Sequence, residues 1–530
     1  MRTRILAFLL LVFVASASFA QKIPNIELGF NANRVYQTGD VDHVNLFNGN
    51  LIVTLPIGQS YHVNGNLSYG MKLVYNSNVW DYRIVPQYDP GHTNTESVPN
   101  LRSNAGMGWR LTMARLIAPY DGTSTNRYNY PGVEAGWSYE DESGAEHAFT
   151  PYAYGVTYVS GTSPSLESFA VQFTTDGSNV RMVRTSATER KLQFPDGSEK
   201  TFRKAGNAWR LERVSDGWGN YVSLVYTSAG SGPNQTLKIT ISDNSLAGRV
   251  QTIDFTYDAG FADGVDGGMK VSQVTLAAFG AATATYLFAY TTTSVPMGCN
   301  ADIPPNSPTS RSVSLLTGVT LPDLSTYSFD YHTTGFGCEQ GALKTLTLPT
   351  GGTIGYTYQM ALLPNSLDAC HSDRATSQIT AIRSRTVGSD RWDYVQTTAA
   401  EAQVTYDNTA TGPCFWSDGG GEPGYSHTNP IVRWSRTSVL APPRPGLTTR
   451  SRSDYYFNTY NKPGEIHPTF AHDADTLTYG WPLTAGVAPP ASAASTPGGQ
   501  MAVEDVPAVD PVTSSPSRFL SEVQYDNCTA

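Results

Sequence analysis

The sequence predicts an all-β protein, an array of antiparallel hairpins that form a long curled sheet, with almost no helix after residue 20. Three observations predict this fold class. Apolar and polar residues alternate along much of the chain, which is the pattern of strands with one buried face. Turn formers are abundant, with 48 Gly and 33 Pro, and the strand former Tyr occurs 30 times. A hairpin motif recurs in the middle of the chain, and no amphipathic segment has the 3.6-residue period of a helix.

Residues 1–20 have the pattern of a secretory signal peptide. Arg2 and Arg4 form a basic start, an apolar run follows over 5–14, and Ala20 ends a stretch of small residues. The apolar run is too short for a membrane span, and no later stretch is long enough for a transmembrane segment. We therefore expect an exported protein that is periplasmic, extracellular or on the cell surface.

Two regions of strands precede the repeat, an N-terminal β region over 21–120 and a β-hairpin region over 121–205. In "VNLFNGNLIVTLPIG" the alternation follows Asn48-Gly49, which is a strong hairpin turn. "LSYGMKLVYNS" and "GMGWRLTMARL" also alternate with a period of two. "KLQFPDGSEKTFR" reads as a hairpin around Asp196-Gly197.

The repeat array is expected over 206–360. "LTGVTLPDLSTYSFDY" from Leu316 and "LKTLTLPTGGTIGYTY" from Leu343 share one pattern: two apolar residues two apart, a turn, then three more at the same spacing. This is the pattern of a β-hairpin with one apolar face. The same template fits three upstream segments, so we expect five hairpins, which end at Tyr226, Tyr257, Tyr290, Tyr331 and Tyr358.

A single hairpin is barely stable in water, whereas hairpins side by side bury a continuous face and pair their edges. The unequal intervals between repeats favour a long sheet that curls over a solenoid of identical rungs. An ordinary large β-sandwich with coincidental spacing is the alternative. The aromatic residues expected in the core of the repeat are Tyr226, Tyr257, Tyr290, Phe329, Tyr331, Tyr356 and Tyr358.

After the array we expect a further β region with two cysteines over 361–480 and a linker or tail rich in Pro, Ala and Ser over 481–530. Within that tail, "RFLSEVQYDN" has the composition to start another strand. An exported protein meets oxidising conditions, so disulfides are expected. Short loops favour the pairs Cys299–Cys338 and Cys370–Cys414, while other pairings and free thiols stay open, and Cys528 is left over.

Several segments, in the same order, resemble the N-terminal region of bacterial RHS or YD-repeat proteins: "VNLFNGNLIVTLPI", "LVYNSNVW", "GMGWRL", "FPDGSEKTF", "SDGWGNYVSLVY" and "LTLPTGGTIGYTY". The resemblance implies a sheet that spirals into a hollow shell, which in that family often encloses a C-terminal toxin or effector. The chain also departs from the family. Among the tyrosines that close the five hairpins, only Tyr257 is followed by an aspartate, Asp258. Asp510-Pro511 does not continue as the family's self-cleaving motif does, so we interpret the chain as a truncated relative.

The sequence indicates no catalytic residues, no metal site and no cofactor. It contains no GxSxG, HExxH or phosphate-binding loop, and no cluster that we assign to catalysis. The net charge of −10 and the lack of a basic patch argue against nucleic acid as a partner. Phe415 and Trp416, in the Gly-rich stretch "CFWSDGGGEPGYSH", are candidates for contact with a sugar.

The resemblance and the composition together suggest an exported, non-catalytic shell or scaffold protein, with a role in toxin or effector delivery or in cell contact. Its expected partners are an effector, a second chain that completes the shell, or a ligand on a cell surface. The alternatives are a secreted carbohydrate-binding β protein and a glycoside hydrolase with a carboxylate pair.

Overall fold

The structure is a computed structural model. It describes residues 28–30, 35–86, 93–100, 102–118, 137–149, 171–174, 176–206, 208–261, 268–280, 282–296, 310–334, 339–363, 378–396, 434–443, 450–458, 499–509 and 516–526. In this part of the chain the regular structure is β, with two short 3₁₀ turns at Gly232–Asn234 and Ala259–Phe261. None of its helices is long and apolar enough to cross a membrane.

The N-terminal region forms a small antiparallel sheet, called here the inner sheet, with the strand order β1-β2-β3-β4-β7. Its strands are β1 (Tyr36–Thr38), β2 (Asp42–Asn45), β3 (Leu51–Asn64), β4 (Leu67–Asn76) and β7 (Trp109–Thr112). The expected turn at Asn48-Gly49 connects β2 to β3, and Gly49 has a φ of 65°. A separate hairpin pairs β5 (Trp80–Pro86) with β6 (Thr93–Pro99).

The rest of the described chain forms one long antiparallel sheet, called here the curled sheet. Its first strands are β8 (Arg115–Ile117), β9 (Ser138–Glu140), β10 (Glu146–Ala148), β11 (Val171–Phe173), β12 (Arg181–Arg184), β13 (Glu189–Gln193) and β14 (Glu199–Ala205). The repeat array contributes β15 (Ala208–Ser215), β16 (Tyr221–Ala229), β17 (Thr236–Asp243), β18 (Val250–Tyr257), β19 (Met269–Ala277), β20 (Thr283–Pro296), β21 (Ser310–Thr320), β22 (Thr326–Tyr331), β23 (Leu343–Thr347) and β24 (Thr353–Leu362). The last strands are β25 (Gln378–Val387), β26 (Asp390–Gln396), β27 (Trp434–Leu440), β28 (Arg452–Asn458), β29 (Gly499–Val509) and β30 (Pro516–Asp526).

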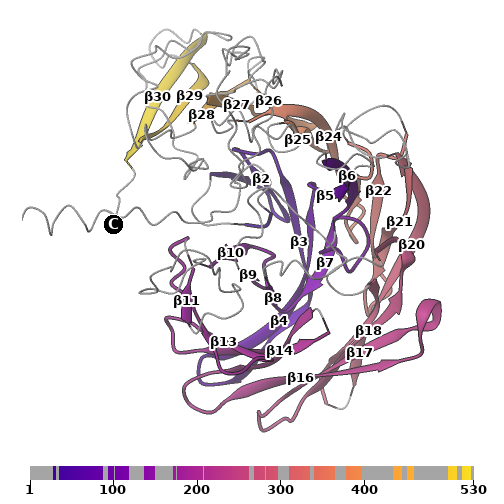
Figure 1. Ribbon diagram of the computed structural model, residues 1–530. Coiled ribbons are helices and arrows are strands. Elements are labelled where there is room, and N and C mark those ends of the chain that lie inside the picture. The colour runs from indigo at the N-terminus through magenta and orange to yellow at the C-terminus, as the bar shows by residue number, and fades with distance from the viewer. Residues whose placement is uncertain are drawn as a thin grey trace, which may run out of the picture.

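From β11 to β30, neighbours in the sequence are also neighbours in the curled sheet. The beginning of this sheet closes on itself. Strands β8, β9 and β10 pair in order, the bridge Phe149–Thr174 leads on to β11, and β15 returns to β8 through Trp209 and Leu116. The later strands continue from β15 as an open arc (Figure 1).

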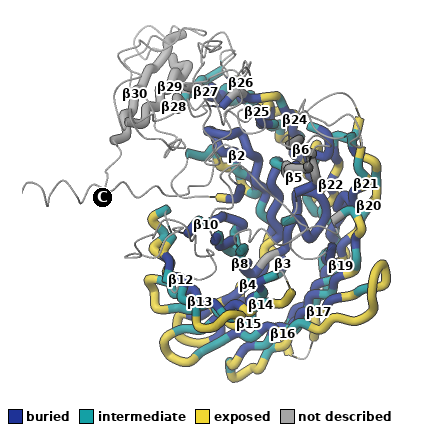
Figure 2. The backbone as a smooth tube through the Cα atoms, viewed as in Figure 1, coloured by how far each residue is buried: buried dark blue, intermediate teal, exposed yellow. Residues whose placement is uncertain are grey.

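The inner sheet lies on the concave side of the curled sheet. In Figure 1 the strands from β13 to β26 run around β2, β3, β4 and β7, and Figure 2 shows much of β3 and β4 as buried. Residues of both sheets belong to a single hydrophobic core. Trp109 of β7 illustrates the packing, because its ring lies 5.0 Å from Tyr75 of β4 and 4.6 Å from Phe329 of β22. The concave side therefore holds a folded part of the same chain.

The predicted fold class is confirmed, as are the five hairpins, which are β15–β16, β17–β18, β19–β20, β21–β22 and β23–β24. A single curled sheet is present where the alternative was a sandwich. The stretch 481–530, expected as a linker or tail, includes β29 and β30, and β30 contains residues 518–526 of the segment singled out as a further strand. The resemblance implied a hollow shell, whereas the inner sheet occupies the concave side because its apolar faces need a partner surface.

Candidate functional site: the seam between the two sheets

The curled sheet contains regularly placed β-bulges. At each bulge, the strand that comes later in the sequence has one extra residue, which has no opposite residue in the strand before it. The extra residue bends the strand and changes the direction of its backbone groups. The bulged strands are β15, β19, β21, β23 and β25. The residues without an opposite partner are Glu212, Ser272, Thr317, Lys344 and Arg383.

The tyrosine that closes a hairpin covers the bulge on the first strand of the same hairpin. Its hydroxyl donates to the backbone carbonyl of the residue just before the bulged one. These bonds join Tyr226 to Leu211 (3.0 Å), Tyr290 to Val271 (2.6 Å), Tyr331 to Leu316 (2.7 Å) and Tyr358 to Leu343 (2.8 Å). A buried backbone carbonyl needs a donor, so the tyrosine supplies one where the strand ladder is interrupted.

The backbone N–H groups of three of these bulges donate to the inner part of the chain. The bonds are Val271 N to Asn104 O (2.8 Å), Leu343 N to the Tyr75 hydroxyl (2.7 Å) and Ile382 N to Gly49 O (2.9 Å). At the last of these bulges the donor to the backbone carbonyl is Gln359 of the preceding strand β24, with its Nε2 3.1 Å from the Ile382 carbonyl. Three of the bulges are therefore points where the curled sheet binds the inner part of the chain.

Gly49 shows how closely the two parts approach. A Cβ atom at this position would lie 2.2 Å from the Cβ of Ala381, far inside van der Waals contact. The backbone of Gly49 also has a positive φ, which favours glycine. The Asn-Gly pair, read in the sequence as a turn signal, thus has a second role, because it lets the β2–β3 turn reach β25.

Two buried carboxylates hold the inner sheet at other points. Asp42 of β2 accepts from Nε and Nη2 of Arg385 (2.6 and 2.9 Å) and from the Tyr356 hydroxyl (2.9 Å). Asp243, at the end of β17, accepts from the Tyr69 hydroxyl at 2.9 Å and from Nε of Arg249 at 2.7 Å. Both carboxylates are buried, so their hydrogen-bond and ion-pair partners offset the cost of removing a charge from water.

The pKa of Asp243 reflects this balance. Burial alone would raise it, but hydrogen bonds from Ser245, Arg249 and Tyr69 outweigh burial and lower the pKa below its ordinary value. The pKa values of the tyrosines that cover the bulges shift in the opposite direction, because burial raises the pKa of Tyr331 and Tyr358 well above 10. They remain neutral hydrogen-bond donors at any physiological pH. We call these tyrosines, the bulges and the contacts of Asp42 and Asp243 the seam.

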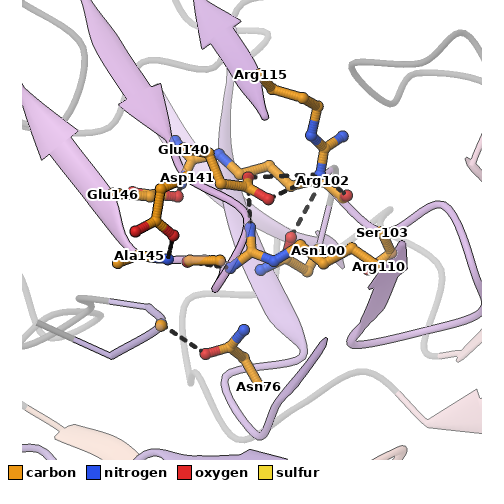
Figure 3. Close-up of polar contacts among 12 residues, drawn as sticks. Asn76, Asn100, Arg102, Ser103, Arg110, Arg115, Glu140, Asp141, Ala145 and Glu146 are labelled. Carbon is orange, nitrogen blue, oxygen red and sulfur yellow. Dashed lines mark hydrogen bonds and ion pairs between the residues drawn. The ribbon is translucent and has the colours of Figure 1, made fainter. Parts of the chain in front are cut away.

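A cluster of buried arginines and glutamates joins the β9–β10 hairpin to β7 and β8 (Figure 3). Arg110 Nη1 lies 2.7 Å from Glu140 Oε2, and Arg115 Nη2 lies 3.4 Å from the same oxygen. Arg102 pairs with Glu146 beside them. The side chains of both glutamates are fully buried, so this cluster compensates charge inside the closed beginning of the curled sheet.

His147 of β10 links two turns of the same region. Its Nδ1 lies 2.5 Å from Asp176 Oδ2, and its Nε2 lies 3.5 Å from Asp141 Oδ2. Burial alone would lower the pKa of His147, but hydrogen bonds to Asp141 and Asp176 and their negative charges outweigh burial and raise the pKa to about 9. The imidazolium bridges the β9–β10 turn and the β11–β12 turn.

The structure places the predicted core aromatics as follows. Phe329, Tyr331, Tyr356 and Tyr358 are buried, and Tyr226, Tyr257 and Tyr290 are partly buried against the core. The four cysteines proposed as disulfide partners, Cys299, Cys338, Cys370 and Cys414, lie outside the described residues, as do Phe415 and Trp416. Within the described residues, no group of three or more His, Cys, Asp or Glu could hold a metal ion.

Sequence reasoning found the seam tyrosines as apolar-face residues and missed their hydroxyl bonds. A signal was present, because in three hairpins the closing tyrosine follows its carbonyl acceptor by 15 residues. Asp42 carried no signal of this kind, since Tyr356 and Arg385 are 314 and 343 positions away. Asp243 has Arg249 six positions on, but its contact with the inner sheet, Tyr69, is 174 positions away. The seam fixes backbone and side-chain positions, and its polar groups are engaged with one another.

No protein-family model and no curated protein matches this chain. Among solved structures, the chain is similar to the N-terminal domain of the effector protein SpvB from Salmonella typhimurium strain LT2. The match has 11% sequence identity and a TM-score of 0.19, and it covers 62% of this chain and 98% of that one.

Proposed function

We propose that this protein is an exported, non-catalytic scaffold of the RHS or YD-repeat type, which supports the delivery of an effector or a contact between cells. One observation carries the proposal: the inner and curled sheets share a single hydrophobic core and are joined through the bulges. The concave side of the curl is filled by the chain's own strands, an arrangement suited to a rigid body that presents its rims and ends to partners.

The chemistry of the seam supports a structural role. The hydroxyls of Tyr290, Tyr331 and Tyr358 donate to backbone carbonyls inside the protein, and burial keeps these side chains neutral. The charged groups Asp42 and Asp243 are held by arginines at 2.6 and 2.7 Å. These groups are committed to holding the two sheets together.

The experiment uses the full chain expressed with its N-terminal segment, followed by cell fractionation and N-terminal sequencing. We expect export and a mature protein that starts near Gln21. The purified mature chain is then incubated with panels of oligosaccharides and glycosides. A scaffold leaves every substrate intact and, after crosslinking in the producing cells, is recovered with a partner in fixed stoichiometry. Retention in the cytoplasm or turnover of a glycoside would overturn the proposal.

A further inference from the structure

A row of exposed apolar side chains lies at one end of the strands of the curled sheet, in the hairpin turns that form this rim of the sheet. Because consecutive strands are neighbours, the turns that follow β15, β17, β19 and β21 all lie at the same edge. Figure 2 shows hairpin turns around β15, β16 and β17 in yellow, the colour of exposed residues. Each of the four turns holds one exposed large apolar residue: Trp218 (85% exposed), Leu246 (105%), Phe279 (100%) and Leu324 (83%). We call these four residues the apolar rim.

The conformation of Leu324 indicates that this side chain is kept for a purpose other than folding. Its backbone has a φ of 69°, in the left-handed region that a bulky residue avoids. The turn "FPDGS" after β13 matches the turn "LPDLS" in its hydrogen bonds, and the corresponding residue there is Gly197, with a φ of 82°. Leu324 therefore accepts backbone strain and gains no burial within the chain.

The rim side chains stand apart from one another. Neighbouring hairpin tips are two strand spacings apart, roughly 10 Å, and the residues around each tip are mostly Gly, Ser, Asn, Asp and Ala. The binding centre of a protein interface is normally a continuous patch that fits a complementary pocket. Isolated Trp, Phe and Leu side chains are better suited to a fluid layer, and these are the residue types that bury in membrane interfaces.

The charges at the rim select the type of lipid. Asp216 and Asp323 lie in two of these turns and are held ionised by hydrogen bonds within the turn, from Trp218 N (2.9 Å) and Ser325 N (3.0 Å). Arg249 is the one Lys or Arg in the four turns, and it is paired with Asp243. An anionic surface would repel this rim, whereas the cationic ammonium groups of zwitterionic headgroups complement its carboxylates.

We propose that the apolar rim inserts into the headgroup region of a zwitterionic lipid bilayer, so that this edge of the curled sheet lies on a membrane. The inference concerns residues outside the seam and does not depend on the scaffold role. The contact is peripheral, with one side chain per hairpin entering the interface and the acidic turns remaining among the headgroups.

The test is flotation of the mature chain with phosphatidylcholine vesicles. The rim variant carries W218S, L246S, F279S and L324G. Its matched control removes four exposed apolar side chains from the strands instead: V225T, L287T, M360T and V395T. Burial of each large apolar side chain is worth about tenfold or more in partitioning, so we expect the rim variant to bind at least about 100-fold more weakly and the control to bind as the natural chain does. Thermal unfolding checks that both variants fold.

A second readout locates Trp218. Brominated phosphatidylcholine should quench part of the tryptophan fluorescence of the natural chain, and W218F should lose that part. No flotation of the natural chain, equal flotation of the rim variant, or binding that requires phosphatidylglycerol and is lost in salt would each overturn the proposal. Rim-dependent dimers in sedimentation without vesicle binding would also overturn it and assign the rim to a second copy of the chain.

Discussion

Two hairpins of the same repeat attach to the inner sheet in different ways. In β23–β24 the bulge at Lys344 turns the backbone of Leu343 inward, where the Tyr358 hydroxyl covers its carbonyl and the Tyr75 hydroxyl accepts from its N–H. In β17–β18 the pairing of β17 with β16 runs without a shift of register. That hairpin is attached instead by the buried carboxylate of Asp243, which binds Tyr69 and Arg249.

The comparison shows that one repeat supports two kinds of attachment. The first uses neutral backbone and tyrosine groups, and its strength should not change over the physiological pH range, since burial keeps Tyr358 neutral. The second uses charge, so it should be sensitive to removal of an ionised group and to pH. The first three predictions that follow distinguish charge-held from bulge-held contacts, and the fourth compares two hairpin turns; they run from the largest expected effect to the smallest.

The largest effect is expected for Asp243→Ala. It leaves Arg249 without its carboxylate and the Tyr69 hydroxyl without its acceptor, and breaking a buried pair in this way costs about 3 to 5 kcal/mol of unfolding free energy. Chemical denaturation of the mature chain measures the loss. Asp254→Ala is the control on the neighbouring strand, because it breaks a solvent-accessible pair with Lys238, whose side chain is 52% exposed, and should cost no more than about 1 kcal/mol. Equal losses in the two variants would contradict a charge-held attachment.

The pH dependence of stability should follow His147, whose bridge between two aspartates is a further charge-held contact. The pKa of His147 is raised from 6.5 to about 9 in the folded protein. A raised pKa means that the stabilisation is fully present below pH 6.5 and is lost as the pH rises to 9, with a size of about 2 to 3 kcal/mol. Unfolding free energies at pH 6, 7.5 and 9 should fall in that order.

His147→Gln is the variant that separates this effect from other titrations. It keeps a polar side chain at the site and removes the ionisable group, so the decline between pH 6.5 and 9 should flatten. A decline of the same size in the variant would show that other groups cause it.

Tyr358→Phe tests the bulge-held attachment. The substitution keeps the ring and removes the hydroxyl, so the buried carbonyl of Leu343 loses this donor, at a cost of about 1 to 3 kcal/mol. Tyr257→Phe is the matched control, because Tyr257 closes the hairpin whose first strand pairs with β16 without a bulge, and it should cost less than about 0.5 kcal/mol. Equal losses of stability in the two variants would show that a tyrosine hydroxyl contributes no more at a bulge than in a hairpin without one.

The hairpins themselves could be predicted from the sequence because their determinants are local. The alternation in "LKTLTLPTGGTIGYTY" and its Gly-Gly turn fix two strands and the face they bury. The five closing tyrosines were therefore found in the correct hairpins. The curl was expected only in general terms, because the bulges that shape it appear in the pairing between strands and not in either strand alone.

The seam could not be predicted because its partners are far apart in the sequence. Leu343 and Tyr75 are 268 positions apart, and Asp42 and Arg385 are 343 apart. No local pattern indicates that an N-terminal sheet fills the curl, and the resemblance to shell-forming proteins pointed to a hollow interior. Asp42 in particular looks like an ordinary polar residue next to a turn until the fold brings Arg385 and Tyr356 to it.

The smallest effects compare the turns FPDGS and LPDLS, which have Gly197 and Leu324 at the corresponding position. Gly197→Leu places a bulky residue at a φ of 82° and should destabilise the protein by about 1 to 2 kcal/mol. Leu324→Gly relieves the same strain at a φ of 69°, but glycine gains freedom in the unfolded chain, so the net gain should be below about 1 kcal/mol. Thermal unfolding of the two single variants measures whether Gly197→Leu lowers the stability and whether Leu324→Gly raises it. If Leu324→Gly destabilises the protein, Leu324 contributes to folding, and its exposure cannot support a contact outside the chain. A gain in stability together with weaker vesicle binding would show that this leucine is kept for the rim at the expense of the fold.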